Sequence, residues 1–186
     1  MTLLAVEVSQ LLDRLAISHA LIGAGALATI GASRSTVDLD FLVVDQRVLD
    51  EAFWADRLPS GATLRTRTGG PEAPLAGLIR LSRAGDRPVD LVVGRDAWQS
   101  EILLRAQVLP FLGGRVPIAL AADLVLLKLY AGGLQDAWDI QQLLASDPKL
   151  ASAVTPQVEA RIAALPSRCR GLWDDLRARR LPSRQV

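Results

Sequence analysis

The sequence has little cysteine and histidine, the residues that make disulfides and most zinc sites. Among its 186 residues there is one cysteine, Cys169, and one histidine, His19. One cysteine cannot form an internal disulfide, and a single Cys/His pair cannot complete a zinc site. We therefore expect a cytoplasmic protein without disulfides or structural zinc. His19 has no nucleophile close to it in the sequence and is predicted to be structural.

An excess of one charge and a long hydrophobic run are missing as well. The chain has 21 Lys and Arg against 20 Asp and Glu, which gives a formal net charge of +1. Such a balance creates no overall field that would attract a nucleic acid or a membrane. No apolar run approaches the roughly 20 residues of a membrane span, and the first residues lack the basic start of a signal peptide. We expect no membrane association, and the 50% hydrophobic content is sufficient for a packed core.

Residues 21–45, LIGAGALATIGASRSTVDLDFLVVD, contain the clearest functional pattern. They predict the end of a strand, a tight turn at residues 23–25, a short helix at 26–30 and a second strand that begins at Val37. Because side chains alternate along a strand, Asp38 and Asp40 should share one face. Neighbouring carboxylates repel each other unless a cation neutralises them. The stretch therefore predicts a divalent-metal site beside a glycine turn that a phosphate could approach.

The other hydrophobic patterns alternate between strand and helix periodicity. Strands are predicted over residues 18–22, 63–68, 78–83, 88–93, 108–112 and 116–118. Helices are predicted for the opening residues from Leu4 to Leu15 and over 46–58, 96–106, 120–131, 134–145, 155–165 and 167–180. These patterns predict an α/β (α+β) fold. It would comprise a small mixed sheet flanked by helices in residues 1–118 and a helical C-terminal part in residues 119–186, packed on this core.

One spacing pattern resembles a known superfamily. The pattern comprises Gly23, Ala26, Gly31, Arg34, Thr36, Asp38 and Asp40, followed by PVDLVVG at residues 88–94 and LVLLKLYAGGLQDAWDI at residues 124–140. It is similar to the nucleotidyltransferase superfamily and looks closest to the small bacterial AbiEii-type (abortive infection) toxin proteins. The resemblance covers roughly residues 15–145 and implies a nucleotidyltransferase-like fold. It also implies magnesium-dependent transfer of a nucleoside monophosphate from an NTP to RNA, tRNA or a protein hydroxyl. A role as the toxin of a toxin–antitoxin or phage-defence pair would add a cognate antitoxin as partner.

The same resemblance implies roles for individual residues. Two magnesium ions would be held by Asp38, Asp40 and the strand residue Asp90, which would also be the catalytic carboxylates. The nucleotide phosphates would contact Gly23, Ala24, Gly25, Arg34, Thr36 and Lys128, with Asp136 and Asp139 in support. Ala24 departs from the pattern, because many active members have a second glycine or a serine there; the hydroxyl is lost but the backbone donor remains.

Several alternatives stay open at the level of sequence. Lys128 could form an ion pair with Asp136 or Asp139 instead of binding phosphate, and Arg34 could neutralise the carboxylates. The chain could be a degenerate member that binds a nucleotide without turnover. G-x-G-x-x-A followed by Asp45 also fits a dinucleotide-binding βαβ unit, but the eleven residues between Gly25 and Val37 are too few for its crossover helix.

Overall fold

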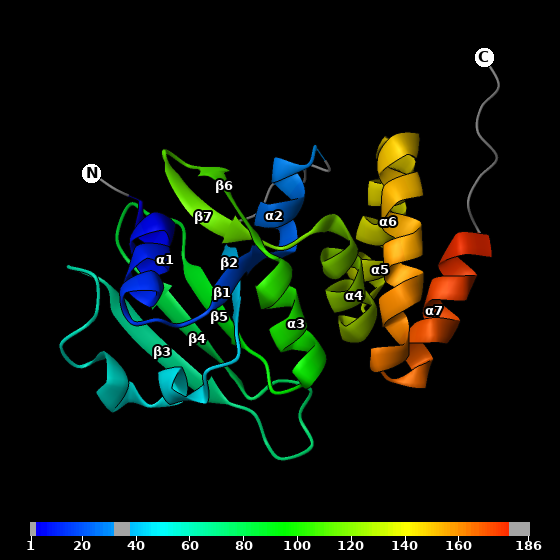
Figure 1. The fold of residues 1–186 in the computed structure, drawn as a ribbon. Helices are drawn as coiled ribbons and strands as arrows, with labels where there is room; N and C mark the ends of the chain where they lie inside the picture. The colour runs from blue at the N-terminus through cyan, green and yellow to red at the C-terminus, as the bar shows by residue number, and fades with distance from the viewer. Residues whose placement is uncertain (1–2, 32–37, 179–186) are drawn as a thin grey trace. The chain divides into compact units, whose positions relative to one another are not determined.

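The computed structural model describes residues 3–31 and 38–178 and has a mixed α/β fold (Figure 1). The chain divides into two compact units. One comprises Met1–Thr29 and Ser33–Leu120, and the other Ile30–Ala32 and Ala121–Val186. The described strands lie in the first unit, and the second contains the helices from α4 onward. A mixed sheet with flanking helices confirms the fold class predicted from the sequence.

The first unit is built on one mixed sheet in which seven strands follow the order β3-β4-β5-β2-β1-β7-β6. The strands are β1 His19–Ile22, β2 Leu39–Val43, β3 Thr63–Thr68, β4 Gly77–Ser82, β5 Val89–Val93, β6 Gln107–Phe111 and β7 Gly114–Ile118. Strand β2 runs parallel to β5 and β1 runs parallel to β7, while the other pairs are antiparallel. The strands predicted over residues 78–83 and 88–93 are confirmed as β4 and β5, which pair as a hairpin, and β5, which carries Asp90, lies beside β2.

Short helices pack on this sheet. They are α1 Leu4–Arg14, α2 Gly23–Thr29, η1 Gln46–Leu49, η2 Glu51–Trp54 and α3 Ala97–Arg105. Helix α1 contacts β7, α2 and α3 contact β1 and β2, and η1 contacts β3 and β4. The single helix predicted over residues 46–58 is wrong. Asp45 accepts a hydrogen bond from the Arg47 amide, and Asp50 does the same for Ala52, so the second cap ends the first helix and starts another.

One face of the sheet is buried in a hydrophobic core. Its fully buried side chains include Phe41, Val43, Ile79, Leu81 and Leu91. His19 is on this face, since it pairs with Val43 across β1 and β2 and its ring meets the edge of Phe41.

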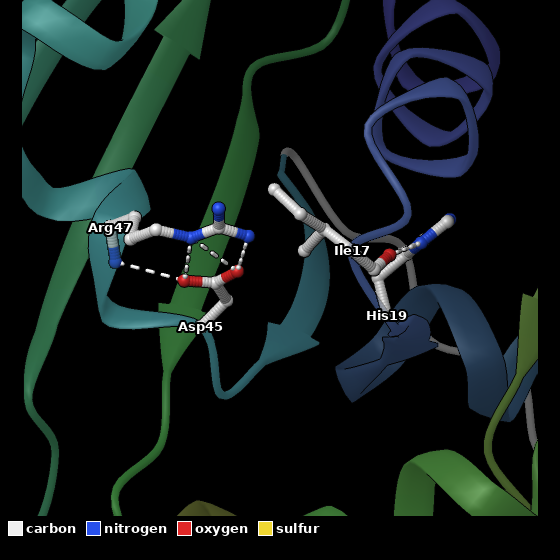
Figure 2. A network of polar contacts seen from close by, with 4 residues as sticks. All are labelled: Ile17, His19, Asp45 and Arg47. Atoms are coloured by element: carbon white, nitrogen blue, oxygen red, sulfur yellow. Dashed lines mark hydrogen bonds and ion pairs between the residues drawn. The ribbon is translucent and has the colours of Figure 1, made fainter.

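The histidine is held by hydrogen bonds on both ring nitrogens. Nδ1 donates to the Ile17 carbonyl oxygen at 3.0 Å (Figure 2), and Nε2 lies 2.7 Å from the Ser9 hydroxyl. Burial lowers the pKa of His19 below its usual value of 6.5. These contacts agree with the structural role predicted for this residue.

The second unit is helical. Its elements are α4 Ala121–Ala131, α5 Leu134–Ser146, α6 Pro148–Arg161, η3 Ile162–Ala164 and α7 Ser167–Ala178. The four α-helices pack on one another around buried Leu129, Ile140, Val158 and Trp173. Helix α6 begins seven residues before the predicted start at Thr155, because the Asp147 side chain caps its first turn and Pro148 occupies the first helical position. Across residues 3–31 and 38–178, no helix combines the length and apolar character that a bilayer crossing requires.

Candidate functional site

Three aspartates lie on the sheet face opposite the Phe41 core. Asp40 of β2 and Asp90 of β5 are direct partners in the parallel pairing of the two strands. Paired residues of neighbouring strands point to the same face, and Asp38, two residues before Asp40, points that way too. The structure thus places the three predicted catalytic carboxylates on one face of the sheet, and their roles as metal ligands remain a prediction.

Arg80 connects two of these aspartates. It lies on β4 directly opposite Asp90. Its Nε donates to Asp90 Oδ1 at 2.8 Å, and its Nη2 donates at 2.6 Å both to Asp90 Oδ2 and to Asp38 Oδ2. The hydrogen bonds to Asp90 raise the pKa of Arg80 above its ordinary value, so the guanidinium stays charged. The sequence analysis missed Arg80 as a member of the site.

The glycine segment approaches the same carboxylates from the end of β1. No separate turn is formed at residues 23–25, which corrects the sequence prediction: α2 begins at Gly23 itself, which has a φ of +64°. A Cβ atom on Gly23 would lie 2.3 Å from Asp40 Oδ2, so only glycine leaves room for this carboxylate. Gly25 is buried in the helix, and a Cβ there would lie 2.9 Å from Leu39 Cδ2. Ala24 is also buried, beside Gly23 in the first turn of α2.

Two other predicted phosphate contacts, Arg34 and Thr36, lie outside the described residues. Asp45, the acidic residue of the dinucleotide-binding alternative, is bound by Arg47, whose Nη2 donates to Asp45 Oδ2 at 2.5 Å (Figure 2). These hydrogen bonds lower the pKa of Asp45. The dinucleotide-binding alternative requires parallel strands on either side of the helix, whereas β1 and β2 are antiparallel. The structure therefore excludes it.

Lys128 lies on α4 in the helical unit and is bound by two carboxylates. Its Nζ donates to Asp136 Oδ1 at 3.1 Å and to Asp139 Oδ2 at 2.6 Å. The Lys128 side chain is 12% exposed and that of Asp139 is 3% exposed. Gln135 Nε2 donates to the other oxygen of Asp139, Oδ1, at 3.0 Å. The ion pair considered from the sequence is therefore present in the structure.

The three aspartates match a divalent cation in chemistry, because magnesium prefers carboxylate oxygens. Two of them are held by Arg80, which donates hydrogen bonds to both oxygens of Asp90 and to one of Asp38. Within the described part of the chain, no three His, Cys, Asp or Glu side chains are grouped as a metal site. The donor set thus fits magnesium in type, while a guanidinium holds two of the three carboxylates.

Comparisons with known proteins identify similar solved structures but no related sequence family. No protein-family model and no curated protein matches the chain. The chain is similar to an antigenic nucleotidyltransferase-like protein from Paracoccidioides brasiliensis, with 21% identity, 94% of this chain and 91% of that chain covered, and a TM-score of 0.48. It is also similar to the antibiotic-resistance factor ANT(2'')-Ia, with 13% identity, 87% and 92% coverage and a TM-score of 0.48. At these values, the function has to be inferred from the side chains of the chain itself.

Proposed function

We propose that the protein is a nucleotidyltransferase that moves a nucleoside monophosphate from an NTP to an acceptor hydroxyl. The observation that carries the proposal is the direct pairing of Asp40 with Asp90, with Asp38 on the same sheet face. Asp38, Asp40 and Asp90 would hold magnesium, in two ions as the sequence resemblance implies. Bound magnesium would neutralise the triphosphate and stabilise the leaving oxygen.

The chemistry asks for few groups from the protein. The acceptor oxygen forms a bond to the α-phosphorus, the bond from that phosphorus to the bridging oxygen breaks, and pyrophosphate leaves. The hydroxyl proton needs an acceptor, and Asp90 is our candidate because its carboxylate is 8% exposed and fixed on a central strand. Both Asp90 oxygens accept a hydrogen bond from Arg80, so the acceptor proton has to reach a second lone pair on one of these oxygens.

The triphosphate would be bound beside these carboxylates. Gly23, Ala24 and Gly25 contribute the first backbone N–H groups of α2, which have no partner within the helix. Arg34 and Thr36 belong to the proposal through the sequence resemblance. The resemblance also assigns Lys128 to phosphate, but its two carboxylate partners favour the ion-pair alternative, in which Asp136 and Asp139 hold it in place.

The acceptor and the partners are proposed from the sequence resemblance alone, and the location is proposed from the low cysteine content. They are a tRNA, another RNA or a protein hydroxyl as acceptor, a cognate antitoxin as partner of a toxin, and the cytoplasm as location. Incubation with radiolabelled NTPs and total RNA or total protein tests the acceptor, because label appears in only the correct fraction.

A second candidate function is nucleotide binding without transfer. The ion pair of Arg80 with Asp90 favours it, since the guanidinium takes up one lone pair on each oxygen and leaves fewer for a proton or a metal ion. Ala24 points the same way, because it lacks the hydroxyl that the resemblance expects. NTP binding in the absence of any pyrophosphate release would select this candidate.

The deciding experiment is calorimetric titration of the four NTPs with and without Mg²⁺, coupled to an assay of pyrophosphate release. The test variant is Asp38→Ala/Asp40→Ala. The matched control is Asp174→Ala/Asp175→Ala, which removes the same charge from exposed positions of α7. We expect the test variant to lose magnesium-dependent binding and to slow transfer by at least about a thousandfold, roughly 4 kcal/mol in the barrier. Unchanged transfer in the test variant would refute the proposal.

A further inference from the structure

The position of Arg80 is unusual for a site that is to receive a divalent cation. Its guanidinium lies between Asp38 and Asp90 and contacts an oxygen of each at 2.6 Å through one nitrogen. A divalent cation held by these carboxylates would need their oxygens and would be repelled by the positive guanidinium beside them. The guanidinium and a divalent cation therefore compete for Asp38 and Asp90.

Arg80 cannot leave the aspartates by losing its own proton. An arginine remains protonated in proteins, and its planar fork matches the two oxygens of Asp90. Near neutral pH, another cation, or a better anion for Arg80, can separate the guanidinium from the carboxylates. The Arg80 side chain is 41% exposed, so it has solvent on one side into which it can turn.

The neighbouring strand shows that Arg80 differs from an ordinary surface arginine. Arg65 on β3 is directly opposite Arg80, and Arg67 follows two residues later on the same face. Among the described residues, the side chains of Arg65 and Arg67 have no hydrogen-bond or ion-pair partner. Arg80 alone of these three contacts the aspartates.

We propose that Arg80 is a positioning residue that acts as an internal counter-ion. It keeps Asp38 and Asp90 together before the substrate arrives, and binding of the divalent cation displaces its guanidinium. The inference rests on the proposed function, because it takes the three aspartates to be the cation site. Displacement releases the Asp90 lone pairs that Arg80 occupied and frees the guanidinium to bind a phosphate of the nucleotide. Binding of the divalent cation would then also prepare Asp90 and Arg80 for the transfer reaction.

The test compares Arg80→Gln with Arg65→Gln. The second variant removes the same charge from the position on β3 that pairs with Arg80. Mn²⁺ is titrated into each purified protein, and free Mn²⁺ is followed by electron paramagnetic resonance without nucleotide. We expect Arg80→Gln to bind Mn²⁺ about tenfold more tightly than the wild type, within the usual range for coupled sites. Arg65→Gln should change the affinity by no more than about twofold, as expected for a screened surface charge.

Two further outcomes separate this inference from the proposed function. If the wild type binds Mn²⁺ and Arg80→Gln binds it no more tightly, the competition is refuted while the cation site stands. If no variant binds Mn²⁺ at millimolar concentration, the cation site itself is refuted and both proposals fail. Arg80→Lys serves if Arg80→Gln does not fold. Lysine keeps the charge but has a single nitrogen, so it binds the two oxygens of Asp90 less well than the arginine fork does. The Mn²⁺ affinity of Arg80→Lys should therefore exceed that of the wild type.

Discussion

Each of the two units contains a cluster in which one basic side chain binds two aspartates, and the clusters differ in their access to solvent. In the sheet unit, Arg80 is 41% exposed and binds Asp38 and Asp90, which come from different strands. In the helical unit, Lys128 is 12% exposed and binds Asp136 and Asp139 of a single helix, α5. An ion pair with solvent on one side is cheap to rearrange, whereas a buried one is costly to break. The comparison favours the Arg80 cluster over the Lys128 cluster as the one that could exchange its cation.

The largest effect is expected at the Lys128 cluster, which is the less exposed of the two. Lys128→Met would leave Asp139 buried without its cation and should lower the free energy of unfolding by about 3–5 kcal/mol. Urea denaturation followed by circular dichroism measures this loss. The control is Lys149→Met, which removes the other lysine of the chain from an exposed position. Lysine-to-methionine exchange there should change stability by less than about 0.5 kcal/mol.

The same variant can contradict the structural role of Lys128. If the lysine contacts a phosphate, Lys128→Met will raise the NTP requirement of transfer while stability stays close to that of the wild type. Adding Asp136→Asn and Asp139→Asn to Lys128→Met should restore part of the lost stability, because it removes the uncompensated charges. A triple variant no more stable than Lys128→Met would show that the ion pair is not the cause.

The cluster of Arg80 with the aspartates could be predicted in part from the sequence. Strand alternation placed Asp38 and Asp40 on one face. A hairpin that turns at residues 84–86 sets Arg80 opposite Asp90, because each lies five residues from Gly85. That local signal was sufficient to find the Arg80–Asp90 pair. The contact of Arg80 with Asp38 was not predictable in this way, since it depends on the parallel pairing of β2 with β5 across 42 positions of sequence.

Local sequence also failed where side-chain caps compete with helix formation. Residues 46–58 have helical periodicity, but Asp45 and Asp50 each bind the amide two residues later and divide the segment into two short helices. At Gly23 the sequence indicated a turn, and the reason for glycine became clear only from the approach of the Asp40 carboxylate. Such contacts between distant segments are the part of a site that periodicity cannot show.

Gly23→Ala measures how tightly Asp40, the third aspartate on this face of the sheet, is packed against Gly23. Alanine would adopt an unfavourable left-handed φ and would also push against Asp40 Oδ2. Gly85→Ala is the control, because Gly85 has a φ of +83° but nothing within 4 Å of an added Cβ. We expect a loss of stability of about 2–3 kcal/mol at Gly23 and about 1–2 kcal/mol at Gly85. Equal losses in urea denaturation would mean that Asp40 moves aside freely.

The smallest effect is expected on the opposite face of the same sheet, where His19 is buried without a cation to exchange. Its lowered pKa keeps it neutral in the folded protein, while the unfolded chain takes up a proton near the ordinary value of 6.5. Stability should therefore fall as the pH decreases below about 6.5, by at most about 1.4 kcal/mol per pH unit. Since the chain has one histidine, urea denaturation between pH 7.5 and 5.5 isolates this residue. His19→Gln should have a flat profile over that range, and a slope equal to that of the wild type would assign the pH dependence to another group.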